Sequence, residues 1–349
     1  MTTGNISLAT SPGSPETGVL DIATRNIIVL LSLTIFGGLI SLVGIVFNAI
    51  NVVAFVKQGF KDTVNITLFG LAISDLGVLV TFLWGGICYN PLFINSGHSF
   101  DPDGLCYLTC GWPSVCFARI TSWITAFVTF ERCMCIAMPL KVKTIITPKR
   151  TVFVVVGIFL TMFANVVPVY CSISLGPTFF RELNKTMIGM VFIPNGETIE
   201  KVALSISIFS QFASFFVVIV CTVVLILNLI RKSKWRQSTS SSAKQKSVSN
   251  RDKKVVKMIL SISIIFIACF LPSGVNFIVI FFLPEYKVTG KYQNLFISTW
   301  CLCKALGTLN SSVNIFVYYN MSSKFKEIVD KMFPGIVGKK ETKKISNGP

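Results

Sequence analysis

Seven long apolar stretches run through the sequence and limit what the chain can fold into. Each is long enough to cross a bilayer as a helix, which takes roughly 20 residues. Only 13% of the residues are charged, whereas soluble proteins carry about 25%. We therefore predict an all-α membrane protein built as a bundle of seven transmembrane helices. The stretches cover residues 27–56, 66–89, 105–138, 150–171, 201–231, 254–283 and 294–319.

Lysine and arginine are distributed unevenly between the connecting segments. Most of the 32 basic residues follow the first, third, fifth and seventh stretches. Because segments rich in Lys and Arg stay in the cytoplasm, we expect the N-terminus outside and the C-terminus inside. The net charge of +17 then marks a cytoplasmic face that attracts anionic membrane lipid, and it gives no indication of nucleic-acid binding. The sequons at Asn5 and Asn184 fall outside and are candidates for glycosylation.

The predicted helices divide the chain into three regions. Residues 1–24 form an extracellular tail, residues 25–320 form the seven-helix domain, and residues 321–349 form a cytoplasmic tail. At the start of that tail, Phe325 and other apolar residues share one face and lysines surround it. This pattern predicts a short amphipathic eighth helix on the inner membrane surface. The Ser- and Lys-rich loop 232–252 is expected to be a flexible linker, with kinase sites as a secondary interpretation.

An acid and a base stand side by side at the inner end of the third stretch. Glu131 and Arg132 close an apolar segment that ends at Pro139. Charged residues in membrane helices are costly and usually functional. Two interpretations are open: Arg132 reaches the interface with Glu131 as its surface partner, or the pair is a switch that releases Arg132 to another partner.

Several motifs stand in order along the chain: Asn48, Leu71 to Asp75, Glu131-Arg132-Cys133, Cys269-Phe270-Leu271-Pro272 and Asn314 to Tyr318. Their order and spacing resemble those of class A (rhodopsin-like) G-protein-coupled receptors across all seven stretches. Within that class the chain resembles the invertebrate chemosensory and neuropeptide receptors, and the region from Trp123 to Lys143 is similar to molluscan-type chemosensory receptors in particular. Three departures from the family pattern are Ile315, Phe270 and Cys133, which stand where the family has Pro, Trp and Tyr.

The resemblance implies a plasma-membrane receptor and no enzyme. Such a receptor transmits the binding of an extracellular small molecule or peptide to a cytoplasmic heterotrimeric G protein, with arrestin and kinases as further partners. The implied switch links Arg132 to Asp252 on the sixth helix, although Asp252 is equally well interpreted as a solvated loop charge. The other residues implied in the switch are Pro272, Phe266, Asn314 and Tyr318.

A set of polar residues falls in the middle of the membrane helices. A lone Asp75 at this depth must be neutral, paired or bound to a metal ion. The family resemblance implies an allosteric sodium ion here, and a protonated Asp75 in a hydrogen-bonded core is the alternative. No other cofactor is expected. The residues of this set are Asp75, Asn48, Thr121, Asn310 and Ser311.

Two cations lie in the outer halves of the helices. If Arg119 and Lys304 both face the bundle interior, they form a cationic cavity suited to a carboxylate, a phosphate or a peptide C-terminus, with Phe270 at its floor. The alternatives to a receptor are a seven-helix transporter or channel and, with less support, a retinal photoreceptor. The family resemblance implies a disulfide between Cys106 and Cys171, with Cys110 as the alternative partner.

Overall fold

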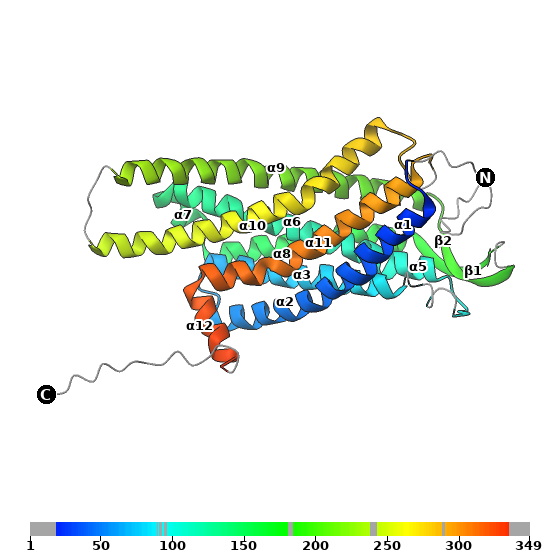
Figure 1. The fold of residues 1–349 in the computed structure, drawn as a ribbon, viewed down its shortest axis with the longest axis horizontal. Coiled ribbons are helices and arrows are strands. Elements are labelled where there is room, and N and C mark those ends of the chain that lie inside the picture. The colour runs from blue at the N-terminus through cyan, green and yellow to red at the C-terminus, as the bar shows by residue number, and fades with distance from the viewer. Residues whose placement is uncertain are drawn as a thin grey trace.

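The computed structural model describes residues 19–88, 90, 93, 96–180, 184–237, 243–287 and 290–334, and the side chains of residues 34, 103, 139, 140, 143 and 232–253 lie outside this description. Helices run along the long axis of the molecule, and a two-stranded hairpin lies at one end (Figure 1). The helices are α1 (Ile22–Val29), α2 (Gly38–Gln58), α3 (Thr63–Cys88), α5 (Pro102–Cys106), α6 (Trp112–Ala137), α7 (Pro139–Ile145), α8 (Pro148–Cys171), α9 (Gly196–Gln237), α10 (Ala243–Phe282), α11 (Gln293–Met321) and α12 (Ser323–Met332), with π-helical segments η1 (Leu30–Gly37) and η2 (Tyr107–Gly111).

Within the described residues, six helical segments are long and apolar enough to cross a membrane. α1, η1 and α2 join into the first of them, so this helix begins at Ile22, earlier than predicted. The Asp21 side chain accepts a hydrogen bond from the Thr24 amide at 3.3 Å and caps the start of α1. That contact holds the pKa of Asp21 below its usual value. The six segments are Ile22–Gln58, Thr63–Cys88, Gly104–Ala137, Pro148–Cys171, Gly196–Arg231 and Lys254–Phe282.

α6 lies at the centre of the bundle and contacts α3, α8, α9 and α10. Its residues Ile120, Ile124 and Val128 are fully buried. Their spacing of four residues places them on one face, so a single stripe of α6 packs into the main core. Large apolar side chains elsewhere point outward, and Phe281 is 80% exposed. Such an outward apolar surface fits a hydrocarbon surrounding.

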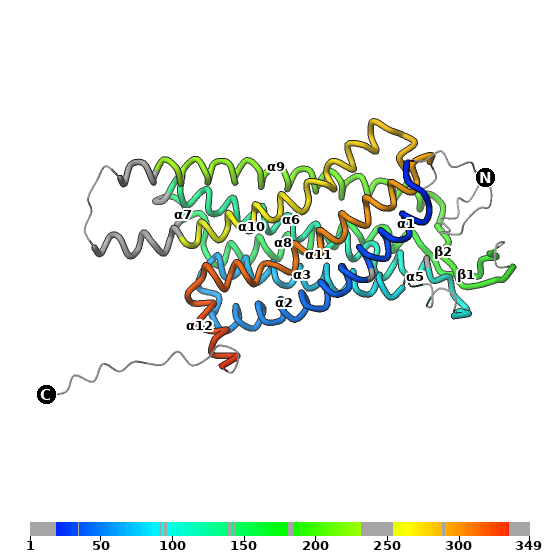
Figure 2. Tube along the Cα trace, viewed as in Figure 1, coloured from blue at the N-terminus to red at the C-terminus, as the bar shows by residue number. Residues whose placement is uncertain are grey.

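α11 buries a row of polar side chains against α2 and α3. Figure 2 shows α2, α3 and α11 running side by side. After α11 the chain turns into α12, which begins where the Ser322 hydroxyl accepts a hydrogen bond from the Phe325 amide. Phe325 is fully buried against Phe55 and Tyr318. This contact fixes α12 to the end of the bundle opposite the hairpin.

The hairpin corrects the expectation that all regular structure would be helical. β1 (Ile173–Phe180) pairs antiparallel with β2 (Lys185–Phe192), with Gly176 opposite Gly189. Asn184 adopts a positive φ of 45° just before β2, as an Asn can in a tight turn. The two strands do not alternate strictly between apolar and polar residues, since β2 ends in the apolar run Met190-Val191-Phe192, and they lie beside a much stronger helical signal.

Candidate functional site

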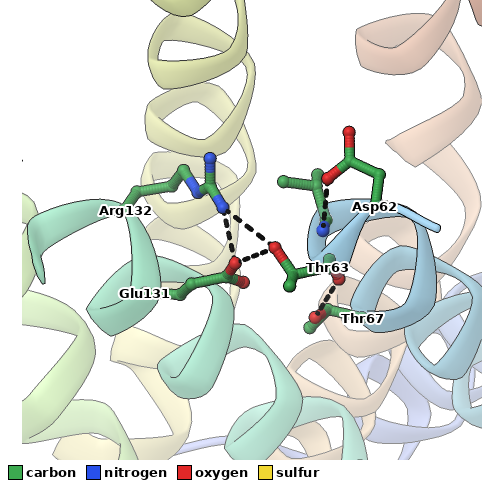
Figure 3. Close-up of polar contacts among 6 residues, drawn as sticks. Asp62, Thr63, Thr67, Glu131 and Arg132 are labelled. Carbon is green, nitrogen blue, oxygen red and sulfur yellow. Dashed lines mark hydrogen bonds and ion pairs between the residues drawn. The ribbon is translucent and has the colours of Figure 1, made fainter. Parts of the chain in front are cut away.

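Glu131 and Arg132 form a buried cluster with Thr63 at the end of the bundle that carries α12 (Figure 3). Arg132 Nη2 lies 2.5 Å from Glu131 Oε1. The Thr63 hydroxyl, at the first residue of α3, donates to the same carboxylate and lies 3.5 Å from Arg132 Nη2. The exposed fraction is 14% for the arginine side chain and 1% for the glutamate side chain. The pair therefore lies inside the bundle and is not a surface ion pair, and Thr63 links it to α3.

Thr63 is the member of this cluster that sequence reasoning missed. It stands at the start of α3, where Asp62 Oδ1 accepts a hydrogen bond from the Val64 amide at 3.1 Å. The Asp62-Thr63 pair is a helix-start signal, and this signal could have placed Thr63 at the inner membrane face. Nothing in the sequence showed that its hydroxyl faces Glu131.

The side chain of Asp252, the other predicted partner of Arg132, lies outside the described residues. α10 runs without interruption through Pro272, which removes one backbone hydrogen bond. Six residues before Pro272, Phe266 is fully buried, and its ring lies 4.7 Å from that of Phe270. Phe266 also packs against Ala126 and Val218. The two rings thus connect α10 to the middle of α6 and to α9.

Asp75 is fully buried and accepts three hydrogen bonds. Ser311 Oγ and Thr121 Oγ1 lie 2.9 Å and 3.2 Å from its Oδ1, and Asn314 Nδ2 lies 2.8 Å from its Oδ2. These donors come from α6 and α11, so the carboxylate of α3 joins three helices. Of the predicted polar set, Thr121 and Ser311 contact Asp75, and Asn314 is a further donor from α11.

Two further members of the predicted polar set are placed differently. Asn48 donates to the backbone oxygens of Gly44 and Ser311, at 3.0 Å and 2.7 Å, and so ties α2 to α11. Asn310 is buried on α11.

Tyr318 is 1% exposed, and its hydroxyl has no hydrogen-bond partner in the described part of the chain. Its ring packs between Phe55 and Phe325.

The two outer cations differ in their surroundings. Arg119 buries its Nε and Nη1 atoms, and neither has a hydrogen-bond partner among the described residues. Lys304 on α11 is exposed and interacts electrostatically with Cys110 and Cys301. The structure shows no direct contact between Arg119, Lys304 and Phe270. Their union in one ligand site remains a prediction.

The expected bridge between Cys106 and Cys171 does not form in this structure. Cys106 is fully buried, whereas Cys171 is an exposed free thiol at the end of α8. The hairpin is attached by backbone pairing instead: Asp101 N donates to Ile188 O at 2.8 Å, and Ile188 N donates to Ser99 O at 3.0 Å. Among the sequons, Asn184 is exposed beside the hairpin turn, and Asn5 lies outside the described residues.

A cavity of about 510 Å³ lies at the hairpin end, and one of about 550 Å³ lies beside α12. The first is lined by residues of η1, α2 and α3 such as Leu33, Gly38 and Phe82. The second is lined by Lys254 on α10 and by Tyr319 and Lys326 on α11 and α12. Neither is lined by Arg119, Lys304 or Phe270.

Comparisons with known proteins give a family for the chain. The family model "Serpentine type 7TM GPCR chemoreceptor Srw" matches residues 35–335. The chain belongs to this family of G-protein-coupled receptors. Relatives include the growth hormone secretagogue receptor type 1 of Mustela putorius furo, 24% identical over 83% of this chain and 77% of its own length.

Two other relatives are also named as receptors. The neuromedin-U receptor 2 of Rattus norvegicus is 26% identical over 85% of this chain and 73% of its own length. The galanin-like G-protein coupled receptor npr-9 of Caenorhabditis elegans is 22% identical over 84% of this chain and 71% of its own length. The chain is thus a multi-pass membrane receptor that signals through a G protein. The transporter, channel and retinal alternatives are not favoured.

Proposed function

We propose that this receptor lies in the plasma membrane with its N-terminus outside. The excess of Lys and Arg in alternate connecting segments supports this orientation. α11, 29 residues long and packed against α10, α2 and α3, is the seventh membrane helix. α12 is the amphipathic eighth helix on the cytoplasmic surface, where its lysines meet anionic lipid. The hairpin then faces the extracellular ligand.

The ligand carries an anionic group that binds Arg119. The observation that carries this proposal is the buried guanidinium with two donor atoms that no described residue satisfies. An unpartnered charge in a low-dielectric interior is costly, so a carboxylate or phosphate that reaches it gains a strong charge-assisted hydrogen bond. Lys304 offers a second cation nearer the outer surface, and Phe270 connects the site to Phe266. Chemosensory organic acids and peptides with a free C-terminus both fit.

The test is a second-messenger assay in cells that express the full chain. A panel of organic acids, amino acids and peptides, each as free acid and as amide, should yield responses only to the free acids. Lys304→Ala should weaken the response by about tenfold, the effect of losing about 1.4 kcal/mol of binding free energy. The matched control is Lys287→Ala, which removes an exposed cation from the loop after α10. Equal responses to acids and amides would refute an anionic ligand.

The cytoplasmic switch starts from the Glu131–Arg132–Thr63 cluster. In the resting state Arg132 stays with Glu131 and Thr63. Ligand binding favours a state in which the inner end of α10 swings outward about Pro272 and Arg132 turns toward the G protein. A contact between Arg132 and Asp252 would add to the resting state. The loop after α9 offers serines to kinases, and their phosphorylation would recruit arrestin.

A sodium ion at Asp75 would stabilise the resting state. The donor set fits, because a carboxylate and the hydroxyl oxygens of Thr121 and Ser311 are the oxygen ligands that hard cations prefer. The ion would supply positive charge for a carboxylate that is otherwise costly to ionise in the membrane. Asn48 is engaged with backbone oxygens and contributes to helix packing instead.

A further inference from the structure

Three cysteines gather at the end of the bundle that carries the hairpin. Cys88 is the last residue of α3, Cys106 is the last residue of α5, and Cys110 lies in η2. All three are buried, and they pack together with Trp84 and Phe93. This cluster is separate from Cys171, the partner that the sequence predicted for Cys106.

Within this cluster, Cys110 lies directly against α3. A Cβ atom added at Gly85 of α3 would lie 3.3 Å from Cys110 Sγ. Side chains in a helix lean toward its N-terminus, and α3 runs opposite to the helix that contains η2 and α6. Cys88, three residues after Gly85, therefore leans back toward the position of Cys110, and Cys110 leans toward Cys106, whose backbone oxygen lies 2.8 Å from Cys110 Sγ. Cys88 and Cys110 are not bridged in this structure.

We propose that Cys88 and Cys110 form a disulfide that joins the outer end of α3 to η2. The proposal rests on the extracellular N-terminus proposed above, which exposes this end of the bundle to the oxidising secretory compartment. The oxidant is a disulfide donor of that compartment. The S–S bond of the donor breaks and takes up two electrons and two protons as two thiols, while the two cysteine thiols lose them and form one S–S bond.

The bridge would fix the end of the bundle to which the hairpin is attached. β1 and β2 contain no cysteine, so hydrogen bonds between Ile188 and the segment before α5 attach the hairpin. Because Cys110 interacts electrostatically with Lys304 on α11, a bridge at Cys110 would also fix the backbone that faces this cation. The start of the third membrane helix would then be rigid where the ligand enters.

The deciding experiment maps the bridge in the full-length receptor. Free thiols on intact cells and in their lysate are blocked with N-ethylmaleimide, and the unreduced protein is digested for mass spectrometry. We expect a linked pair of peptides that contains Cys88 and Cys110 and separates on reduction. Maleimide on both residues, or a link from either of them to Cys106, would overturn the proposal. Glycosylation of Asn184 in the same sample tests the orientation separately.

Two further measurements exclude a merely structural effect of the cysteines. Cys110→Ser should lower the thermal midpoint of the detergent-solubilised receptor by roughly 5–10 °C. Cys116→Ser, a matched control, removes another buried thiol on the following helix and should leave the midpoint unchanged. If Cys110→Ser does not reach the surface, Cys88→Ala is the second variant, and it should show the same fall because it removes the other half of the bridge. A midpoint for Cys88→Ala equal to that of wild type would count against the bridge.

Discussion

Two arginines of α6, Arg132 and Arg119, differ in the partners that surround their guanidinium groups. Arg132 donates to Glu131 at 2.5 Å and lies 3.5 Å from the Thr63 hydroxyl. Arg119 is thirteen residues earlier, about 20 Å along the same helix, and its Nε and Nη1 atoms have no partner among the described residues. Both lie in segments that belong to the membrane part of the receptor. They differ in whether the protein itself supplies the counter-charge.

The difference assigns the two residues to different partners. A buried charge without a partner destabilises the fold, so it persists in natural sequences chiefly where function needs it. Arg132 has its counter-charge in Glu131, although its Nε also lacks a hydrogen-bond partner among the described residues, and it must lose the contact with Glu131 before it can bind another partner. Arg119 gains contacts when an anion arrives. In terms of counter-charge, α6 therefore carries an incomplete cation, Arg119, for the ligand and a complete one, Arg132, for the switch.

The largest expected effect comes from removing the incomplete cation. Arg119→Ala should raise the half-maximal concentration of an anionic agonist by about a hundredfold, since a charge-assisted contact in a buried site contributes on the order of 3 kcal/mol. Concentration–response curves measured at matched surface expression give this shift. Arg119→Lys should retain part of the response, because it keeps the charge but loses the planar fork. An unchanged curve for Arg119→Ala would place the ligand elsewhere.

Removing the charge that pairs with Arg132, the complete cation, should have a smaller effect, and this effect should raise signalling instead of weakening it. Glu131→Gln keeps the shape and the contact with Thr63 but removes the charge that holds Arg132. Losing one charged hydrogen bond, about 2 kcal/mol, should shift the equilibrium toward the active state by about 30-fold. Signalling without agonist should therefore rise while agonist affinity changes little. Basal signalling equal to wild type would mean that Glu131 does not restrain Arg132.

The sequence predicted the membrane helices well because their signal is the sum of many residues. α8, for example, covers Pro148–Cys171 where residues 150–171 were predicted. The buried positions of Asp75, Ser311 and Thr121 were also predictable, since polar residues inside apolar stretches must face one another. Contacts that depend on a single rotamer or on helix rotation were not predictable. The hydroxyl of Thr63 on Glu131 is one example.

The outer end of the bundle was predicted least well. There the family resemblance suggested a bridge to Cys171, but this residue is exposed at the end of α8. Pairing of short strands depends on backbone partners far apart in sequence, as between Phe100 and Ile188. No local pattern records such a partner. The long apolar stretches were enough to predict the membrane helices, whereas the loop sequences predicted little of the structure at this end.

The smallest expected effect comes from changing Thr63, the uncharged member of the Glu131–Arg132–Thr63 cluster. Thr63→Val removes the hydroxyl that donates to Glu131 and keeps the shape of the side chain. One neutral-donor hydrogen bond contributes about 1 kcal/mol, so the resting-to-active equilibrium should shift about fivefold. The control is Thr67→Val, one turn further along α3, whose hydroxyl donates to the Thr63 backbone oxygen at 2.9 Å and not to the cluster. Basal signalling should rise for the first variant only.

A double-mutant cycle then separates two routes by which Thr63 could act. If the Thr63 hydroxyl acts by orienting the Glu131 carboxylate, the effect of Thr63→Val should largely vanish in a Glu131→Gln background, because no charged carboxylate is left to orient. If it restrains Arg132 directly across 3.5 Å, the two effects should add. The short contact with Glu131 and the long contact with Arg132 favour the first outcome. If the effects of the two substitutions on basal signalling add strictly, Thr63 restrains Arg132 itself. Arg132 would then have two independent partners, Glu131 and Thr63, whereas Arg119 has no counter-charge in the described part of the chain.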